Sequence, residues 1–178
     1  MTFLVLAERE PALQALDAAD AWRGDASLTS RQGGKVCAVV HMRGSGPAGD
    51  AKLLAAWQRW RDAMPAGVAR VSAASNGDVQ VRTCDPGAAA KFAVTDAGDR
   101  ALAYPVGRVE AAAEVMDQSK RSTSGLKISP KAAYCYSDGA IRIIPAYALL
   151  DNGSGWQPDA ATQRKLQMAL LNCMTENP

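Results

Sequence analysis

The sequence contains one histidine, His41, and no cluster of acidic residues. A hydrolase with a serine or cysteine nucleophile usually takes its general base from an imidazole, so any such site here would need His41. Zinc sites and EF-hand calcium sites need several histidine, cysteine or carboxylate ligands. We therefore expect no metal and no cofactor, and the balance favours a protein that is not an enzyme.

Long apolar runs are missing as well. None approaches the roughly 18 residues of a transmembrane helix, and the first, Phe3–Ala7, stops at the charged residues Glu8–Glu10. The same run is too short for a signal peptide, which also needs a basic region before it. We expect no transmembrane segment in this chain, and an exported form would have had its signal or anchor removed.

The chain also lacks an excess of charge of one sign. Its 20 Lys and Arg residues against 18 Asp and Glu leave a net charge of +2, far from the basic surface of a nucleic-acid-binding protein. Apolar residues make up 48% of the 178 residues, which is enough for a hydrophobic core, and no stretch resembles a linker. We predict one domain over residues 1–178 and no nucleic-acid partner.

The four cysteines have no short spacing, since 47, 51 and 38 residues separate Cys37, Cys84, Cys135 and Cys173. These gaps exclude a CxxC redox pair and a zinc ribbon. The even number and wide spacing favour two structural disulfides, and therefore an oxidising compartment such as the periplasm or the cell surface. Four buried thiols in a cytoplasmic protein are the alternative.

Of the three possible connectivities, we predict Cys37 with Cys84 and Cys135 with Cys173. The first two cysteines lie on expected strands that can be neighbours. The third lies in an expected hairpin, and Cys173 lies on the inner face of the expected final helix, so that a bridge would tie that helix to the sheet.

Apolar residues at helical spacing predict four main helices. They lie at Pro11–Trp22, at Ala51–Met64, around Val109–Met116, and from Pro158 past Cys173. Asp50 is expected to cap the second of these helices, on which Trp57 and Trp60 share one face and are expected in the core. The alanine-rich segment Ala88–Val94 is expected to form a short fifth helix.

β-prone segments predict the strands. Thr2–Ala7 and Lys35–Met42 are expected to be single strands, and Val68–Cys84 a hairpin that turns at Asn76-Gly77. A second hairpin is expected over Ala132–Ile144. Since hairpins force antiparallel pairing, the fold class is α+β, with a mixed or antiparallel sheet that carries two hairpins and is covered by about four helices.

The segment Gly44–Gly49 matches the pattern G-x-G-x-x-G between an expected strand and an expected helix. In these six residues the chain resembles dinucleotide-binding proteins, in which glycines let a pyrophosphate approach a helix N-terminus. Asp50, however, places a negative charge where phosphate would bind. The next strand also carries Arg70–Ser72 where a ribose-binding acid would be expected, so we prefer a connecting loop with no bound nucleotide.

A local basic patch is formed by Lys120, Arg121, Lys127 and Lys131. It could hold a phosphate or an acidic partner, but no aromatic residue interleaves for base stacking, and a solvated loop is the preferred interpretation. Trp156 lies in a polar loop and is the better candidate for an exposed aromatic anchor at a protein interface.

Together these features favour a non-catalytic, extracytoplasmic domain, periplasmic or at the cell surface. It would bind a protein partner or self-assemble, as a subunit of a cell-envelope, pilus-like or other secreted structure. The alternative is a small enzyme or nucleotide-binding protein that uses Gly44–Gly49.

Overall fold

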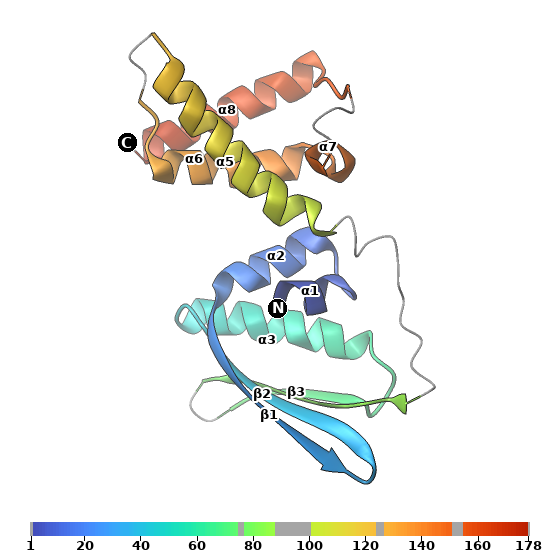
Figure 1. The fold of residues 1–178 in the computed structure, drawn as a ribbon. Helices are drawn as coiled ribbons and strands as arrows, with labels where there is room; N and C mark the ends of the chain where they lie inside the picture. Colours follow the sequence, from blue (N-terminus) through green and yellow to red (C-terminus); the bar gives the residue numbers. More distant parts are fainter. Residues whose placement is uncertain (1, 75–76, 88–100, 124–126, 151–154, 178) are drawn as a thin grey trace. The chain divides into compact units, whose positions relative to one another are not determined.

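The computed structural model describes residues 2–74, 77–87, 101–123, 127–150 and 155–177 (Figure 1). The chain divides into two compact units, Met1–Gly98 and Asp99–Pro178. The expected α+β class is confirmed, with a four-stranded antiparallel sheet, helices and two disulfides. That the whole chain forms one domain stays a prediction, and the expected helix Ala88–Val94 lies outside the described residues.

The first unit begins with two helices, α1 (Thr2–Ala7) and α2 (Ala12–Ala21). The strand expected over Thr2–Ala7 is therefore wrong. A six-residue apolar run does not distinguish a strand from a buried helical turn, and here the helix buries Leu6 completely and packs on α2. Its end is closed by Arg9 and Glu10, whose N–H groups both donate to the Leu6 carbonyl at 2.9 Å.

The sheet has the strand order β1-β2-β4-β3, and all neighbours are antiparallel. The strands are β1 (Trp22–Gln32), β2 (Lys35–Gly44), β3 (Ala69–Ala73) and β4 (Val79–Cys84). The hairpin expected over Val68–Cys84 is confirmed. Strand β1 was not predicted, because its polar sequence has no alternation of apolar residues. It joins β2 through a turn at Gly33 and Gly34, which both have positive φ.

The core of the first unit lies between one face of the sheet and α3 (Pro47–Asp62), with α1 and α2 on the other side of α3 (Figure 1). The sheet contributes Met42, Val71, Val79 and Val81. Trp57 and Trp60 are buried against each other in a T-shaped contact with ring centroids 5.1 Å apart, so their expected place in the core is confirmed. In the described residues no element covers the opposite face of the sheet.

The second unit is helical in its described residues. It comprises α5 (Ala103–Arg121), α6 (Pro130–Ile143), α7 (Ala146–Leu150) and α8 (Ala160–Glu176). Helix α6 packs against both α5 and α8, and α7 packs on α5 (Figure 1). The helices expected around Val109–Met116 and after Pro158 are confirmed, and the latter is capped by Asp159, whose carboxylate accepts from Thr162 N at 2.7 Å.

The hairpin expected over Ala132–Ile144 is wrong, because this segment is helix α6. Pro130 suits the first helical turn, and the Ser129 hydroxyl caps it by accepting from Ala132 N at 3.1 Å. Buried residues of α6 recur at helical spacing, at Ala133, Ser137 and Ala140. The turn-like residues Ser137–Gly139 therefore lie within a helix, where packing outweighs their local preference.

Both predicted disulfides are confirmed. Cys37 and Cys84 are directly paired residues of β2 and β4, on the sheet face away from α3. Cys135 and Cys173 join α6 to α8, so the second pairing is correct although its expected hairpin is a helix. Each bridge lies within one unit.

We expect Gly107→Ala to destabilise the second unit by about 1–3 kcal/mol in urea unfolding. A Cβ at Gly107, in α5, would lie 2.9 Å from Leu149 Cδ2 and 3.0 Å from Leu149 Cβ, in α7. The matched control is Gly139→Ala in α6, where the nearest atom, Ala169 Cβ, lies 3.6 Å away. That control should be neutral or stabilising, by up to about 1 kcal/mol, because alanine favours a helix. Equal effects of the two substitutions would contradict tight α5–α7 packing.

Candidate functional site

The structure brings two of the four predicted patch residues to one pocket. Lys120, at the end of α5, and Lys127, before α6, line a pocket of about 450 Å³. The other lining residues are Met116, Ser119, Ser122, Ile128 and Pro130. Arg121 forms an ion pair with Asp117 one turn earlier, and Lys131 is exposed in the first turn of α6. Neither of these lines the pocket.

The pocket combines an apolar floor with a basic rim. Met116 and Ile128 pack against the buried cluster of Ala112, Val115 and Ala133, and Ile128 N donates to Ser119 Oγ at 2.9 Å, which fastens this segment to α5. An apolar floor below two ammonium groups suits an amphipathic anion. Exposed lysines are equally common on a solvated surface, so binding at this patch stays a prediction.

A phenol lies next to that floor. Tyr136, on α6, packs against the same cluster. Burial raises the pKa of the Tyr136 phenol, and the Glu114 carboxylate adds to the rise, so this side chain stays neutral at physiological pH. Trp156, the predicted aromatic anchor, is half-buried ahead of α8. Its role as a binding residue stays a prediction.

The loop Gly44–Gly49 lies between β2 and α3, as predicted, and its first two N–H donors are engaged within the protein. The N–H of Gly44 donates to Asp50 Oδ1 at 2.7 Å, and the N–H of Ser45 donates to the Ala21 carbonyl at 2.8 Å. A Cβ on Gly44 would lie within 2.8 Å of three backbone atoms of Gly49 and Asp50. Glycine is needed here because the loop contacts itself, with no ligand required.

The expected N-cap at Asp50 is wrong. Helix α3 starts at Pro47, after Gly46 with φ of 93°, and Asp50 lies within its first turn. Proline at the first position carries the fixed φ of a helix and has no N–H to satisfy, which moves the start upstream. The Asp50 carboxylate instead receives the backbone N–H of Gly44.

We expect no thermal shift with NAD, NADP, FAD or ATP at millimolar concentration. The Asp50 carboxylate already receives the Gly44 N–H and would repel a phosphate at the start of α3. Differential scanning fluorimetry checks this. A saturable rise of several degrees would overturn it, because ligand binding stabilises a protein in proportion to ln(1+[L]/Kd).

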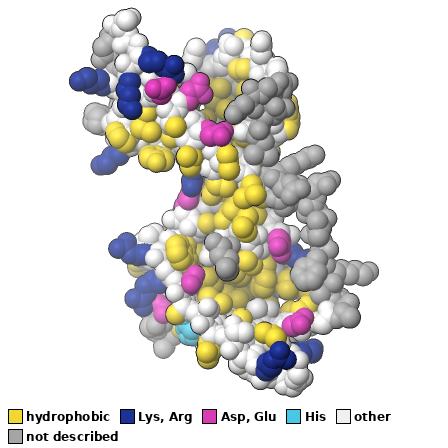
Figure 2. Space-filling view, in the orientation of Figure 1, with side chains coloured by type: hydrophobic (Ala, Val, Ile, Leu, Met, Phe, Trp, Pro, Cys, Tyr) yellow, Lys and Arg dark blue, Asp and Glu magenta, His cyan; other side chains and the backbone are white. Residues whose placement is uncertain are grey.

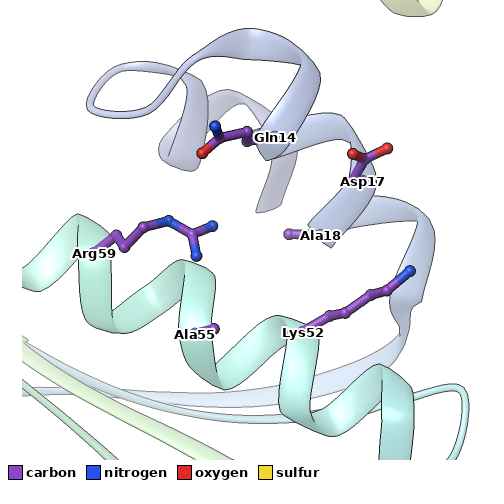
Figure 3. A pocket seen from close by; sticks show the side chains of 6 residues that line it. All are labelled: Gln14, Asp17, Ala18, Lys52, Ala55 and Arg59. Atoms are coloured by element: carbon purple, nitrogen blue, oxygen red, sulfur yellow. The ribbon is translucent and has the colours of Figure 1, made fainter.

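A second pocket, which the sequence analysis missed, lies between α2 and α3 (Figure 3). It has a volume of about 430 Å³ and is lined by Gln14, Asp17, Ala18, Lys52, Ala55 and Arg59. The facing alanines leave the space, and the polar side chains stand along its rims (Figure 3). The only sequence signal for this pocket is that both helices carry small residues, Ala18 on α2 and Ala55 on α3. Small residues on facing helices predict close packing as readily as a cleft.

One rim of this pocket is held by an ion pair. Arg59 donates from Nε to Glu10 Oε1 at 3.0 Å and from Nη2 to Glu10 Oε2 at 3.2 Å, and the Glu10 side chain is only 2% exposed. This bidentate pair ties the segment before α2 to α3. Asp17 and Lys52 stand on opposite helices and suit a small zwitterion. The Glu10–Arg59 pair itself is structural.

His41 lies in β2 on the sheet face away from α3, with its Nε2 2.9 Å from the side-chain nitrogen of Gln80. An amide partner neither activates a nucleophile nor orients a base as a carboxylate would. In the residues that the structure describes, no group of three His, Cys, Asp or Glu side chains is placed to hold a metal ion.

Comparison with models of protein families, with curated proteins and with solved structures gives no match. None of the described helices combines the length and apolar character needed to cross a membrane.

Proposed function

We propose that this chain is a non-catalytic binding or assembly domain that works outside the cytoplasm, as part of a cell-envelope or surface structure. One observation carries the proposal: helix α5 is apolar on two opposite sides, and among the described residues of the second unit other elements pack on only one of them.

The covered side of α5 faces its neighbours in the second unit and includes Ala103, Gly107 and Val115. On the opposite side, Leu102, Val106 and Val109 are spaced by four and three residues and form one stripe. Their exposed fractions are 46%, 42% and 60%. We call these three residues the α5 stripe. Hydrophobic side chains are visible over the surface of this unit (Figure 2).

A helix that is apolar on both sides is normally covered on both. Contiguous exposed apolar surface marks an interaction site more often than chance exposure does. The exposed carboxylate of Glu110 borders the stripe, and that of Glu114 follows one turn further along the same side of α5. The partner that fits is therefore a protein segment with apolar side chains flanked by basic ones.

The disulfides support the proposed compartment. All four cysteines are paired in the structure, and protein disulfides persist mainly where the surroundings are oxidising. The alternative, an enzyme or nucleotide-binding protein that uses Gly44–Gly49, has less support, because Asp50 and Ala21 engage the N–H groups of Gly44 and Ser45, and the Asp50 carboxylate lies in the first turn of α3.

Replacing Val106 and Val109 together by serine should remove partner binding and leave the fold unchanged. Serine and valine have similar helix propensity, and both valines are exposed, so the melting temperature should stay within a few degrees. The measurement is chemical crosslinking in the native host, where the double variant should lose a discrete adduct at least tenfold. Glu110→Lys should weaken the same adduct, because it opposes a basic flank.

The matched control is Val36→Ser, because Val36 is also 42% exposed but lies in β2. It should leave the adduct intact. The proposal fails if the wild type gives no adduct, or if Val36→Ser and the stripe variant behave alike. A large drop in the melting temperature of the stripe variant would show that the stripe packs within the protein.

Thiol trapping in intact cells tests the compartment. An alkylating reagent applied before lysis should label no cysteine of the native protein, and the same reagent should label all four after denaturation and reduction. The chain produced in a reducing cytoplasm is the control and should label fully. Free thiols in the native protein would contradict an extracytoplasmic site.

A further inference from the structure

Strand β1 forms an edge of the sheet, since it pairs with β2 on one side only. It is eleven residues long, and every side chain along it is exposed or half-exposed. Edges of this length are usually blunted by proline, by charged side chains, by a bulge or by a covering element. Strand β1 contains no proline, and Leu28, one residue past its midpoint, is 69% exposed, more than any other large apolar side chain in the described residues.

The hairpin turn determines which backbone groups face outward. Gln32 and Lys35 flank the two-residue turn, and in such hairpins the flanking residues exchange both hydrogen bonds. Since bonded and non-bonded pairs alternate along an antiparallel ladder, Ser30 and Leu28 also bond to β2. The N–H and C=O groups of the odd-numbered residues from Asp25 to Arg31 are therefore directed to the free edge.

These outward residues are complementary to a second copy of themselves. We propose that β1 of a second copy of this chain pairs antiparallel with β1, in a register centred on Leu28. Each Leu28 then faces the second copy's Leu28 on the two-fold axis. Ser27 faces Thr29 of the second copy, and Asp25 faces its Arg31. Symmetry gives every pair away from the axis twice, so the dimer contains two Asp25–Arg31 ion pairs.

Neighbouring registers do not match in this way. Centring on Ser27 would place Arg23 opposite Arg31 of the second copy, and like charges directly opposite each other destabilise a strand pair. Centring on Thr29 would place Asp25 opposite Gly33, in the turn. The ladder also has natural limits, because β1 is irregular between Trp22 and Gly24 and ends at Gln32. The chosen register pairs these two ends, Gly24 with Gln32.

The resulting dimer has one continuous eight-stranded sheet, because antiparallel addition across a two-fold axis perpendicular to the sheet keeps each face on its own side. This inference deepens the proposed assembly function by naming a second copy of the chain as one partner. It depends on β1 alone, so it and the α5 stripe can fail separately.

Sedimentation of the whole chain over the micromolar to millimolar range tests the dimer. The wild type should pass from monomer to dimer. Asp25→Arg and Arg31→Asp should each raise the dimer dissociation constant at least about tenfold, because each leaves like charges opposed. Mixing the two variants should restore association as a 1:1 heterodimer, because each ion pair re-forms between an arginine of one chain and an aspartate of the other.

Crosslinking tests the register. Leu28→Cys should give a disulfide-linked dimer on mild oxidation, because the two Leu28 positions form a non-hydrogen-bonded pair with Cα atoms about 4.5 Å apart. Ser30→Cys is the control and should not crosslink, because it lies four residues, about 13 Å, from its own symmetry mate.

A wild type that stays monomeric throughout, or a variant mixture that does not associate, overturns the inference. If the α5 stripe variant abolishes the dimer and the β1 variants do not, self-association runs through α5; this inference then fails and the proposed function stands. If the α5 stripe variant loses the crosslinked adduct in cells but still forms the β1 dimer in sedimentation, both proposals are supported.

Discussion

The contact between Gly44 and Gly49 determines how the first unit is built. Gly44 is the last residue of β2, and its backbone lies against that of Gly49 and Asp50 in the first turns of α3. This close contact leaves no room for a side chain on Gly44. Asp50 holds this turn by receiving the Gly44 N–H, and Ser45 holds it by donating to the end of α2. One short loop therefore joins a strand to two helices and directs α3 across the sheet.

Placing α3 on one face leaves the other face to polar and cross-linked residues. Cys37 and Cys84 bridge β2 and β4 there, beside the pair formed by His41 and Gln80. A bridge between neighbouring strands adds a covalent tie on the side of the sheet where the described residues of the first unit form no packed layer. Its largest effect is expected on the unfolded chain, where closing a loop of 47 residues removes roughly 4 kcal/mol of conformational freedom in the entropy model.

The sequence was informative where strong local chemistry and tertiary packing agree. Asn76-Gly77 between β-prone segments predicted the β3–β4 hairpin, and the apolar spacing after Pro158 predicted α8, which the Asp159 carboxylate caps in the structure. The wide spacing of the cysteines predicted two bridges, and their pairing followed from the expected neighbouring strands of Cys37 and Cys84 and the expected inner face of Cys173. The candidate pocket was predictable only in part, because Lys120 and Lys127 are close in sequence whatever the fold.

Predictions failed where short-range signals are ambiguous. Thr2–Ala7 has apolar residues that suit a strand, but in the structure it packs on α2, and a helix satisfies its backbone without a neighbouring strand. Ser137–Gly139 has the composition of a turn, yet it lies within α6, where Ser137 is buried and its hydroxyl bonds to the Tyr134 carbonyl at 2.9 Å. The polar strand β1 has no apolar face of its own and forms by pairing with β2, so that periodicity could not predict it.

The composition of the second unit explains why it presents apolar surface. Its inner faces are built largely from alanine and glycine, with Ala112, Ala133 and Ala140 buried and Gly107 against Leu149. Small residues let helices approach closely, but each buries little area, so a core made of them stabilises weakly. The bridge between Cys135 and Cys173 compensates by tying α6 to α8. The residues of the α5 stripe, Leu102 directly before the helix and Val106 and Val109 within it, are then not needed inside and remain exposed, which is the surface that the proposed partner would cover.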